Sequence, residues 1–400
     1  MGEPIPALRV RALDDSPPRA SGRYVLYWMV AQRRVRHNFA LQHAAAWAKR
    51  LGKPLLVLEA LRIGHRWAND RLHRFVLEGM AVNGRRLEAA GVGYYPYLEP
   101  AADQGKGLLA ALAADACLVV SDDYPCYFIP RMVAAAARRL QVRFEVVDGN
   151  GVIPLQASPD AFTTAHAFRR WLQKQGATHL LQMPLADPLV ALPARKARVS
   201  AEIGKRWPKL SAKTLADPTR LAAAIAALDI DHDVAPAPMR GGAEAGEAQL
   251  RGFLQDRLAR YADDRSSLEH DASSGLSPWL HFGHVGAHEV VAAVLAREGW
   301  SPDRLGDPKL TRGSREGWWG LSPGAEAFMD ELVTWRELGH IYCWHNPDDY
   351  MRYGSLPSWA RKTLAEHADD PRPSLYSLAE LEQALSEDPL DLSSELNLAA

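Results

Sequence analysis

The sequence predicts an α/β domain followed by a mostly helical one. Two observations lead to this. Between residues 22 and 150, five short β-prone apolar runs alternate with helical patterns, and near residue 156 the β-branched runs stop. Such alternation is typical of a parallel sheet with helices on both faces. A chain of 400 residues also has room for about two or three domains.

The elements of the first half follow one another in regular order. Residues 1–21 are rich in Pro, Arg and Asp and are expected to form a loose lead-in. The predicted strands are short apolar runs at 25–30, 53–61, 92–98, 116–121 and 142–148. The helices expected between them cover residues 36–50, 65–90, 107–114 and 129–140. We therefore expect a Rossmann-like, parallel, five-stranded sheet.

The second half has a different composition. Residues 160–230 are expected to form helices and long connections, and residues 231–248, rich in Ala, Pro and Gly, are expected to be a linker or mobile loop. Helical patterns dominate after that. The predicted division is an α/β domain, interdomain helices with a linker, a helical domain and a short tail, at residues 22–158, 159–245, 246–390 and 391–400.

Charge and cysteine content exclude several classes of protein. The 47 Lys and Arg residues against 48 Asp and Glu residues give a net charge of −1, which argues against histone-like binding but not against a local basic groove. The three cysteines form no C-x-x-C pair, so a disulfide framework is excluded. The N-terminus lacks the apolar core of a signal peptide, and no apolar run reaches the roughly 18 residues of a membrane span. A soluble, cytoplasmic protein with no membrane partner is expected.

Two patterns are misleading. GKGLLA (105–110) fits a G-x-G-x-x-A fingerprint, but it lies at the third crossover rather than after the first strand, so a plain helix start is favoured. Glu337, His340, Cys343 and His345 resemble a metal site. Only the first three can share a helix face, and no matching cluster occurs elsewhere, so we predict no metal.

Tryptophan is concentrated in the second half. Seven of the twelve lie between residues 279 and 359, at Trp279, Trp300, Trp318, Trp319, Trp335, Trp344 and Trp359. This pattern indicates either a helical core built with large aromatics or a site that stacks planar groups such as flavins or nucleobases.

Two segments bear on that choice. Residues 273–283, SSGLSPWLHFG, place small hydroxyl side chains around a glycine before a helix, where they could donate to a phosphate, although a plain N-cap uses the same residues. Glu331 and Trp335 are four residues apart and share one helix face. A carboxyl beside an indole could clamp a nucleobase by its edge and its face, while the alternative is an ordinary amphipathic helix.

Together these segments resemble the photolyase/cryptochrome family, and within it the class II cyclobutane pyrimidine dimer photolyases. VLYWMVAQRRVRHNFAL (25–41) is similar to the first strand and following helix start of that class. SSGLSPWLHFG (273–283) is similar to its flavin-phosphate segment, and DELVTWREL (330–338) to its substrate helix, with SWARKTLAEH (358–367) and LYSLAELE (375–382) after it. Order and spacing agree over most of residues 22–390.

The resemblance implies a flavin enzyme acting on DNA. FAD would bind in the helical domain and, when reduced and excited by blue light, donate an electron to a pyrimidine dimer flipped out of damaged DNA. A second, antenna chromophore of unknown identity is possible in the α/β domain, and no protein partner is implied. The residues that the resemblance assigns to FAD are Tyr261, Ser273, Ser274, Leu276, Ser277 and Arg336.

The resemblance also assigns residues to the substrate. Glu331 would hydrogen-bond the dimer and stabilise the negative charge that develops on it, and Trp335 would stack on the dimer. These two are the expected catalytic residues, and Trp335 would also bind DNA. The candidates for DNA phosphate contacts are Arg352, Arg361 and Lys362, which could equally be solvated charges of a helix face.

One departure from the family pattern concerns the C-terminus. After a D-P-L segment the family continues with Trp-Asn and a further stretch, whereas here Leu390 is followed by DLSSELNLAA, with Asp391 in place of the tryptophan. We therefore expect a truncated helical domain and a doubtful activity. A cryptochrome-like photoreceptor, which needs no dimer clamp, and a non-catalytic nucleotide-binding remnant stay open as alternatives.

Overall fold

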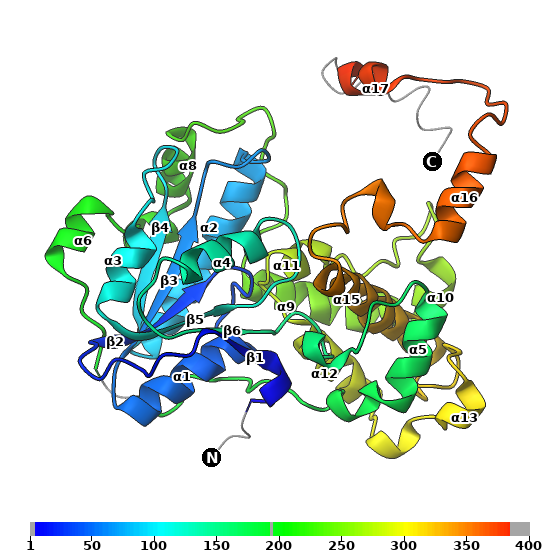
Figure 1. The fold of residues 1–400 in the computed structure, drawn as a ribbon, viewed down its shortest axis with the longest axis horizontal. Coiled ribbons are helices and arrows are strands. Elements are labelled where there is room, and N and C mark those ends of the chain that lie inside the picture. The colour runs from blue at the N-terminus through cyan, green and yellow to red at the C-terminus, as the bar shows by residue number, and fades with distance from the viewer. Residues whose placement is uncertain (1–4, 193–194, 385–400) are drawn as a thin grey trace. The chain divides into compact units, whose positions relative to one another are not determined.

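The computed structural model describes residues 5–192 and 195–384 of the chain (Figure 1). The chain divides into two compact units, Met1–Tyr350 and Met351–Ala400. The first unit contains an α/β half and a helical half. The departure of the sequence after Leu390, and the tail that follows it, lie outside the described residues.

The α/β half is built on a six-stranded sheet of order β1-β6-β5-β2-β3-β4 (Figure 1). Its strands are β1 (Val10–Asp14), β2 (Tyr24–Met29), β3 (Leu55–Leu61), β4 (Gly93–Leu98), β5 (Ala116–Asp122) and β6 (Phe144–Val147). The five predicted strands are β2 to β6, and every pairing among them is parallel. The predicted α/β class is confirmed. The chain first winds from β2 towards β4 and then returns to β5, so the order reverses between β2 and β5.

The sixth strand, β1, is a difference from the sequence prediction. It pairs antiparallel with β6, with Val10 opposite Val147, so the expectation of a loose lead-in is wrong for residues 10–14. This edge strand is only partly buried and carries one arginine, Arg11. Arg11 forms a two-bonded ion pair with Asp123, at 3.0 and 3.1 Å. A strand held by charges at an edge does not show the apolar run by which buried parallel strands are predicted.

Helices cover both faces of the sheet. They are α1 (Phe39–Leu51), α2 (Asp70–Ala89), α3 (Leu108–Ala114) and α4 (Ile129–Ala137). Successive residues of β2 face opposite sides, so Tyr27 lies in the core on the α1 side and Leu26 in the core on the α3 and α4 side. The GKGLLA segment runs into α3 through Gly107, whose φ is +89°, as its interpretation as a helix start predicts.

Helices also make up the rest of the described chain. In the sequence, the α/β half is followed by α5 (Ala165–Lys174), α6 (Ala201–Arg206), α7 (Ala212–Ala216) and α8 (Pro218–Ala226). The helical half contains α9 (Ala243–Gly252), the π-helical η4 (Phe253–Arg257), η5 (Leu258–Arg260), α10 (Tyr261–Asp264), α11 (Ser277–His281), α12 (Ala287–Arg297), α13 (Pro308–Thr311), α14 (Pro323–Met329), the π-helical η7 (Asp330–Trp335) and α15 (Arg336–His345). The second unit contains η8 (Tyr353–Ser355), α16 (Ser358–Glu366) and α17 (Leu378–Ala384). Part of the linker predicted at 231–248 is therefore helix α9.

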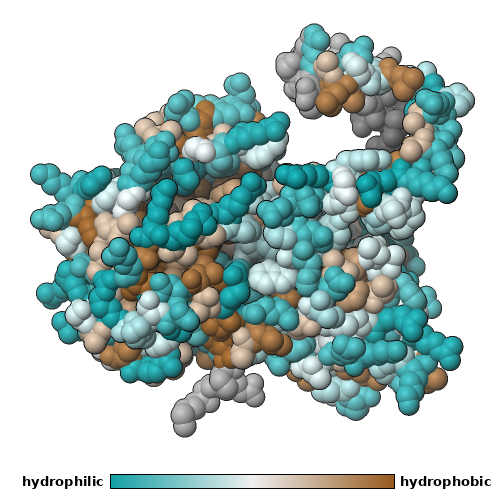
Figure 2. Space-filling model, viewed as in Figure 1, coloured by the Kyte–Doolittle hydropathy of each residue, from teal (hydrophilic) through white to brown (hydrophobic). Residues whose placement is uncertain are grey.

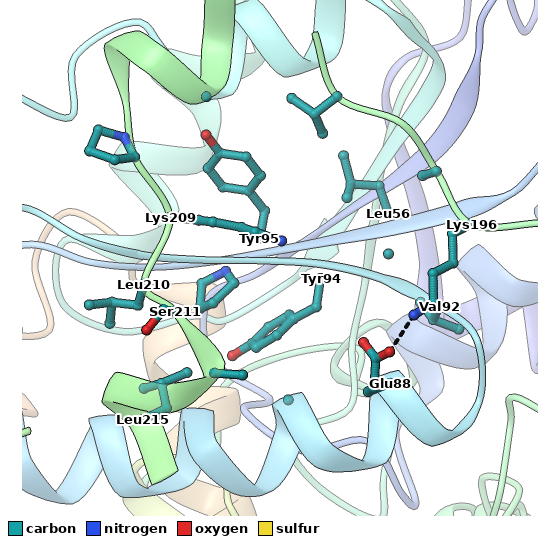
Figure 3. A pocket seen from close by; sticks show the side chains of 18 of the residues that line it. Leu56, Glu88, Val92, Tyr94, Tyr95, Lys196, Lys209, Leu210, Ser211 and Leu215 are labelled. Atoms are coloured by element: carbon teal, nitrogen blue, oxygen red, sulfur yellow. Dashed lines mark hydrogen bonds and ion pairs between the residues drawn. The ribbon is translucent and has the colours of Figure 1, made fainter. Parts of the chain in front are cut away.

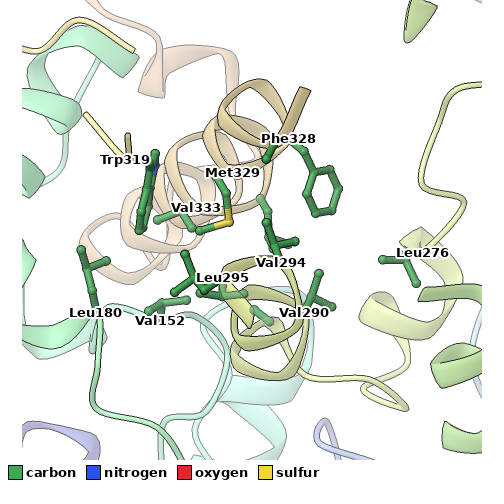
Figure 4. Close-up of a cluster of buried hydrophobic side chains, with 14 of the residues drawn as sticks. Val152, Leu180, Leu276, Val290, Val294, Leu295, Trp319, Phe328, Met329 and Val333 are labelled. Carbon is green, nitrogen blue, oxygen red and sulfur yellow. The ribbon is translucent and has the colours of Figure 1, made fainter. Parts of the chain in front are cut away.

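One apolar core joins the helical half to the end of the α/β half. Val152, which follows β6, packs in the same cluster as Val294 of α12 and Phe328 of α14 (Figure 4). Most of the clustered tryptophans belong to this core. Trp279, Trp318 and Trp319 are buried in it, and Trp300 and Trp344 pack against it. Trp335 and Trp359 are instead exposed. The core interpretation therefore holds for five of the seven.

The second unit exposes its apolar side chains. Helix α16 has no buried residue. The large apolar side chains exposed here include Trp359, Leu364, Leu375 and Leu378, and hydrophobic side chains are visible among hydrophilic ones in the space-filling view (Figure 2). The predicted boundaries at residues 158, 245 and 390 stay a prediction.

Candidate functional site

The segment after β2 is fixed by one buried carboxylate. Asp122, the last residue of β5, accepts hydrogen bonds from the backbone N–H groups of Val30, Ala31 and Gln32 at 2.9, 2.7 and 2.9 Å, and from the Tyr27 hydroxyl at 2.7 Å. Three consecutive N–H groups aimed at one carboxylate form an anion-binding concavity of the backbone. The point where the strand order reverses, where open α/β sheets usually bind ligands, is thus occupied by the chain's own loop.

The flavin-like segment 273–283 docks on that loop through Gly283. The glycine has a φ of +70°, and a Cβ built on it would lie 1.8 Å from the carbonyl oxygen of Ala31. The buried Arg34 donates from Nη1 to the carbonyl oxygen of Gly283 at 3.1 Å. Only a residue without a side chain allows both the backbone conformation and the close approach. Two segments that carry the resemblance, 25–41 and 273–283, are therefore in direct contact.

The third segment, 330–338, reaches the same edge of the sheet. Arg336 donates from Nη1 to the carbonyl oxygen of Asn150 at 2.5 Å, and Glu337 accepts from the N–H of Val152 at 2.5 Å. Asn150 in turn donates to the carbonyl oxygen of Asp123 beyond β5, at 2.6 Å. The loops that follow β2, β5 and β6 thus form the contact with the helical half.

Glu337 is a strongly perturbed carboxyl group in this contact. Its side chain is fully buried, and burial raises its pKa to about 7 despite the opposing charge of Arg336. Among the described residues Oε2 has no hydrogen-bond partner, and a Cβ on Gly151 would lie 1.9 Å from it. A buried, half-satisfied carboxyl favours its protonated form. Glu337 therefore carries a proton-dependent contact between the two halves.

The predicted substrate clamp lies on η7. Glu331 and Trp335 are four residues apart in this π-helical segment, close to one full turn, and half of the Trp335 side chain is exposed. Glu331 forms an ion pair with Arg265, whose guanidinium carbon lies 5.8 Å from the centre of the Tyr261 ring. Short π-helical segments occur frequently at functional sites. The structure thus places Glu331 beside Tyr261, a residue assigned to FAD.

The other side of η7 is anchored firmly. Asp330 binds Arg169 of α5 through two hydrogen bonds of 2.7 Å each. Such a two-bonded charged pair fixes orientation as well as distance. Burial, with a smaller contribution from the charge of Glu331, raises the pKa of Tyr261, so its ring keeps a neutral hydroxyl. The clamp residues are therefore presented on a rigid support.

The serine segment presents its hydroxyl groups at the surface. Ser273 donates from Oγ to Asp271 at 2.8 Å, and the Oγ of Ser274 accepts from the N–H of Leu276 at 3.3 Å. Leu276 is fully buried and anchors the segment in the core that also contains Tyr261. Ser277 begins α11 and is exposed. Hydroxyl groups of this kind can donate to phosphate oxygens, and the assignment of these residues to a flavin nucleotide stays a prediction.

The remaining predicted residues are Arg336 and three basic residues of the second unit. Arg336 points towards Asn150 in the α/β half, and its place beside a flavin stays a prediction. The residues assigned to DNA phosphates, Arg352, Arg361 and Lys362, belong to the second unit. Lys362 lies 3.6 Å from Glu366, four residues on, as in an ordinary exposed helix pair. Their role in DNA binding also stays a prediction.

The metal-like pattern of α15 has a different explanation in the fold. In residues 5–192 and 195–384, no group of three or more His, Cys, Asp or Glu residues could hold a metal ion. Glu337 faces Val152, and the ring of His340 lies edge-on to Tyr124 at 5.8 Å. Over the same residues, no helix has both the length and the hydropathy that crossing a bilayer requires.

A separate cavity of about 780 Å³ lies in the α/β half, between α2, β4 and residues 196–216 (Figure 3). Tyr94 and Tyr95 of β4 contribute to its lining, and Lys196 pairs with Glu88 at its edge at 2.5 Å. Its size is that of small-molecule pockets. None of the predicted site residues is among those that line it, and a second chromophore stays a prediction.

Sequence reasoning missed the residues that support the site. Arg265 pairs with Glu331 across 66 positions, and Arg34 binds Gly283 across 249. Neither pair leaves a local pattern. The Y-A-D-D-R spacing from Tyr261 to Arg265 is a weak signal, because residues four apart on a helix are neighbours.

The comparisons with known proteins agree with this geometry. No family model matches the chain. Proteins named deoxyribodipyrimidine photo-lyase are similar over nearly the whole chain. The one from Methanothermobacter thermautotrophicus is 28% identical over 96% of this chain and 76% of its own length. Those from Arabidopsis thaliana and Potorous tridactylus are 27% and 26% identical, over 94% and 96% of this chain and 69% and 65% of their own lengths.

Solved structures agree with the fold. A class III photolyase from Agrobacterium tumefaciens matches with a TM-score of 0.54 and 18% identity, over 82% of this chain and 60% of its own. The cryptochrome of Synechocystis sp. PCC6803 matches with a TM-score of 0.53 and 15% identity, over 86% of this chain and 68% of its own. The resemblance to the photolyase/cryptochrome family that the three motif segments carry is confirmed by these relatives and by the shared fold.

Proposed function

We propose that this protein repairs cyclobutane pyrimidine dimers in DNA by light-driven electron transfer, as a deoxyribodipyrimidine photolyase of the class II type with FAD as cofactor. The observation that carries the proposal is the clamp on η7. A carboxylate and a half-exposed indole, about one turn apart, face outwards from a rigid helical support. The names of the relatives support the same reaction class.

The clamp and its neighbour Arg265 offer both a hydrogen-bond acceptor and a hydrogen-bond donor to a base. Glu331 and Arg265 keep about a third of their side chains exposed, 36% and 31%. The carboxylate can accept from a ring N–H, and the guanidinium can donate to a ring carbonyl oxygen. A pyrimidine presents these groups side by side on its edge. Trp335 would stack on the face of the same base, and Arg265 would stabilise negative charge that develops on its oxygen atoms.

The serine segment is the proposed phosphate site of the cofactor. Ser273, Ser274 and Ser277 would hold the phosphates, and Tyr261 and Leu276 would line the ribityl side. A bound, reduced flavin would supply the electron when excited by blue light. The contribution of the chain is to orient the cofactor and the base and to keep both on the fixed support of η7 and α11.

The proposed partner is damaged DNA. A dimer stacks poorly, so flipping it costs only a few kcal/mol, and the modest net charge of the chain is compatible with recognition of a flipped base. Arg352, Arg361 and Lys362 would contact phosphates and Trp335 the lesion. A cytoplasmic location is part of the same proposal.

The test uses the purified chain loaded with FAD and reduced. Blue light should remove dimers from irradiated DNA, and a dark sample should not. Glu331→Ala should lower the repair yield at unchanged flavin content. Trp335→Ala should weaken binding to dimer-containing DNA more than to undamaged DNA. Trp67→Ala removes another exposed tryptophan, 64% exposed and remote in sequence, and should change neither.

Each alternative predicts its own result. A cryptochrome-like photoreceptor, suggested by the structural likeness to the Synechocystis protein, would bind flavin and respond to light but leave dimers unrepaired. A nucleotide-binding remnant would retain no flavin. Either outcome would overturn the proposal for this chain.

A further inference from the structure

Two cysteines from distant parts of the sequence lie side by side in the fold. Cys126 follows β5 in the α/β half and is buried, and Cys343 lies on α15 of the helical half and is half-buried. A side-chain hydrogen bond joins the two thiols, and both are free. No part of the proposed repair reaction uses either residue.

Neighbouring contacts hold both segments in this arrangement. Two residues before Cys126, the ring of Tyr124 lies 5.8 Å from that of His340, one turn before Cys343 on α15. One residue after Cys126, the N–H of Tyr127 donates to the hydroxyl of Tyr350 at 2.6 Å. The sulfur atoms therefore lie between two independent contacts of the same two segments. Their approach is a feature of how α15 docks rather than of two side-chain rotamers.

The two thiols differ in reactivity. The pKa of Cys126 is raised, first by its hydrogen bond to Cys343 and then by burial, whereas the same hydrogen bond lowers the pKa of Cys343. Cys343 is also the more exposed of the two. The thiolate is the reactive form of cysteine, so Cys343 is the group that a reagent from solution meets first.

We propose that Cys126 and Cys343 are a redox-modification site, which forms a reversible disulfide between the β5 loop and α15 on reaction with a peroxide. The Cys343 sulfur attacks one peroxide oxygen, the O–O bond breaks, and a sulfenic acid and one water are formed. The Cys126 sulfur then attacks the Cys343 sulfur and displaces a second water. Two electrons pass from the thiols to the peroxide. A small dithiol restores both thiols by exchange and is itself oxidised to its disulfide.

The bond would constrain the contact between the two halves. Helix α15 also carries Arg336 and Glu337, which bind the loop after β6. A covalent link one to two turns further along the same helix would hold α15 against the sheet edge whether or not Glu337 is protonated. This inference does not rest on the proposed repair activity.

The experiment is a thiol map of the full chain after treatment with hydrogen peroxide. The protein is oxidised, unfolded, alkylated and digested without reduction. We expect one cross-linked peptide pair containing Cys126 and Cys343, lighter than the two thiol peptides by about two hydrogens, while Cys117 is alkylated. Cys117 lies fully buried in β5 and serves as the internal control. Treatment with a dithiol should restore alkylation of both partners.

Variants separate a specific pair from general oxidation. In Cys126→Ala, a sulfenic acid at Cys343 should persist and react with a dione probe, because its resolving thiol is absent. Cys117→Ala should leave the cross-link unchanged. Over-oxidation of Cys343 in the wild type with Cys126 still free, or a link only between two copies of the chain, would overturn the inference. The peptide map of the wild type decides this even if a variant does not fold.

Discussion

Replacement of Glu337 by Gln should remove a pH dependence from the stability of the first unit. Burial raises the pKa of Glu337 to about 7 in the fold, from its ordinary value of 4.5. The folded chain therefore binds this proton more tightly than the unfolded chain does. The stabilisation is fully present below pH 4.5, decreases as the pH rises, and is lost above about pH 7. The difference between the two pKa values corresponds to roughly 3 kcal/mol.

Urea unfolding followed by tryptophan fluorescence measures this effect, since the free energy of unfolding falls linearly with urea. Between about pH 5 and pH 8, the free energy of unfolding of the wild type should fall by up to roughly 3 kcal/mol, whereas that of the Glu337→Gln variant should not show this decrease. The glutamine oxygen can still accept from Val152, so the comparison changes the charge and retains this hydrogen bond. Equal pH slopes in the two proteins would refute the assignment of the raised pKa to Glu337.

Three further predictions concern stability and use the same assay. Burial acts to raise the pKa of Glu145, but its partners, led by His43, lower it to about 2. The ionised carboxylate therefore stabilises the fold at neutral pH, and this stabilisation is lost as the pH falls towards 2. Glu145→Gln should lower the free energy of unfolding by up to about 3 kcal/mol at pH 7 and leave it almost unchanged near pH 2. Gly283→Ala should cost at least about 2 kcal/mol, whereas Gly299→Ala, at a similar φ with open space around it, should cost about 1 kcal/mol. Equal costs would show that the close contact between Gly283 and Ala31 does not contribute to stability. Phe328→Ala should cost about 3–5 kcal/mol through the cavity it leaves, and a smaller loss would mean that the core collapses.

The parallel sheet could be predicted because its strands are buried on both faces. β2, β3 and β5 are almost entirely buried, so each is a continuous apolar run in the sequence. β1 could not be predicted in that way. Its place is set by Arg11 and by the fully buried Arg9, whose guanidinium donates to carbonyl oxygens beyond β6, and a charged residue gives no signal of burial.

The candidate site could be predicted only where it is local in sequence. The spacing of Glu331 and Trp335 is visible in the sequence because both lie on one helical turn. The partner of Glu331 is not visible, because Arg265 approaches from another helix. The docking of Gly283 on the loop after β2 is likewise hidden, since it depends on a backbone contact between residues more than 200 positions apart.

Because Asp122 binds the chain's own loop, the sheet edge supports the helical half instead of binding a ligand there. In related open sheets the reversal point receives a nucleotide, and here it receives the peptide groups that carry the helical half. If the proposed function holds, a change at Asp122, Arg34 or Gly283 would contact neither the flavin nor the dimer, but it would shift the helices on which both are to be aligned. A 1 Å displacement of reacting groups can cost a hundredfold in rate. Substitutions at this contact should therefore lower the repair yield under light in a protein that still folds and still binds flavin and DNA.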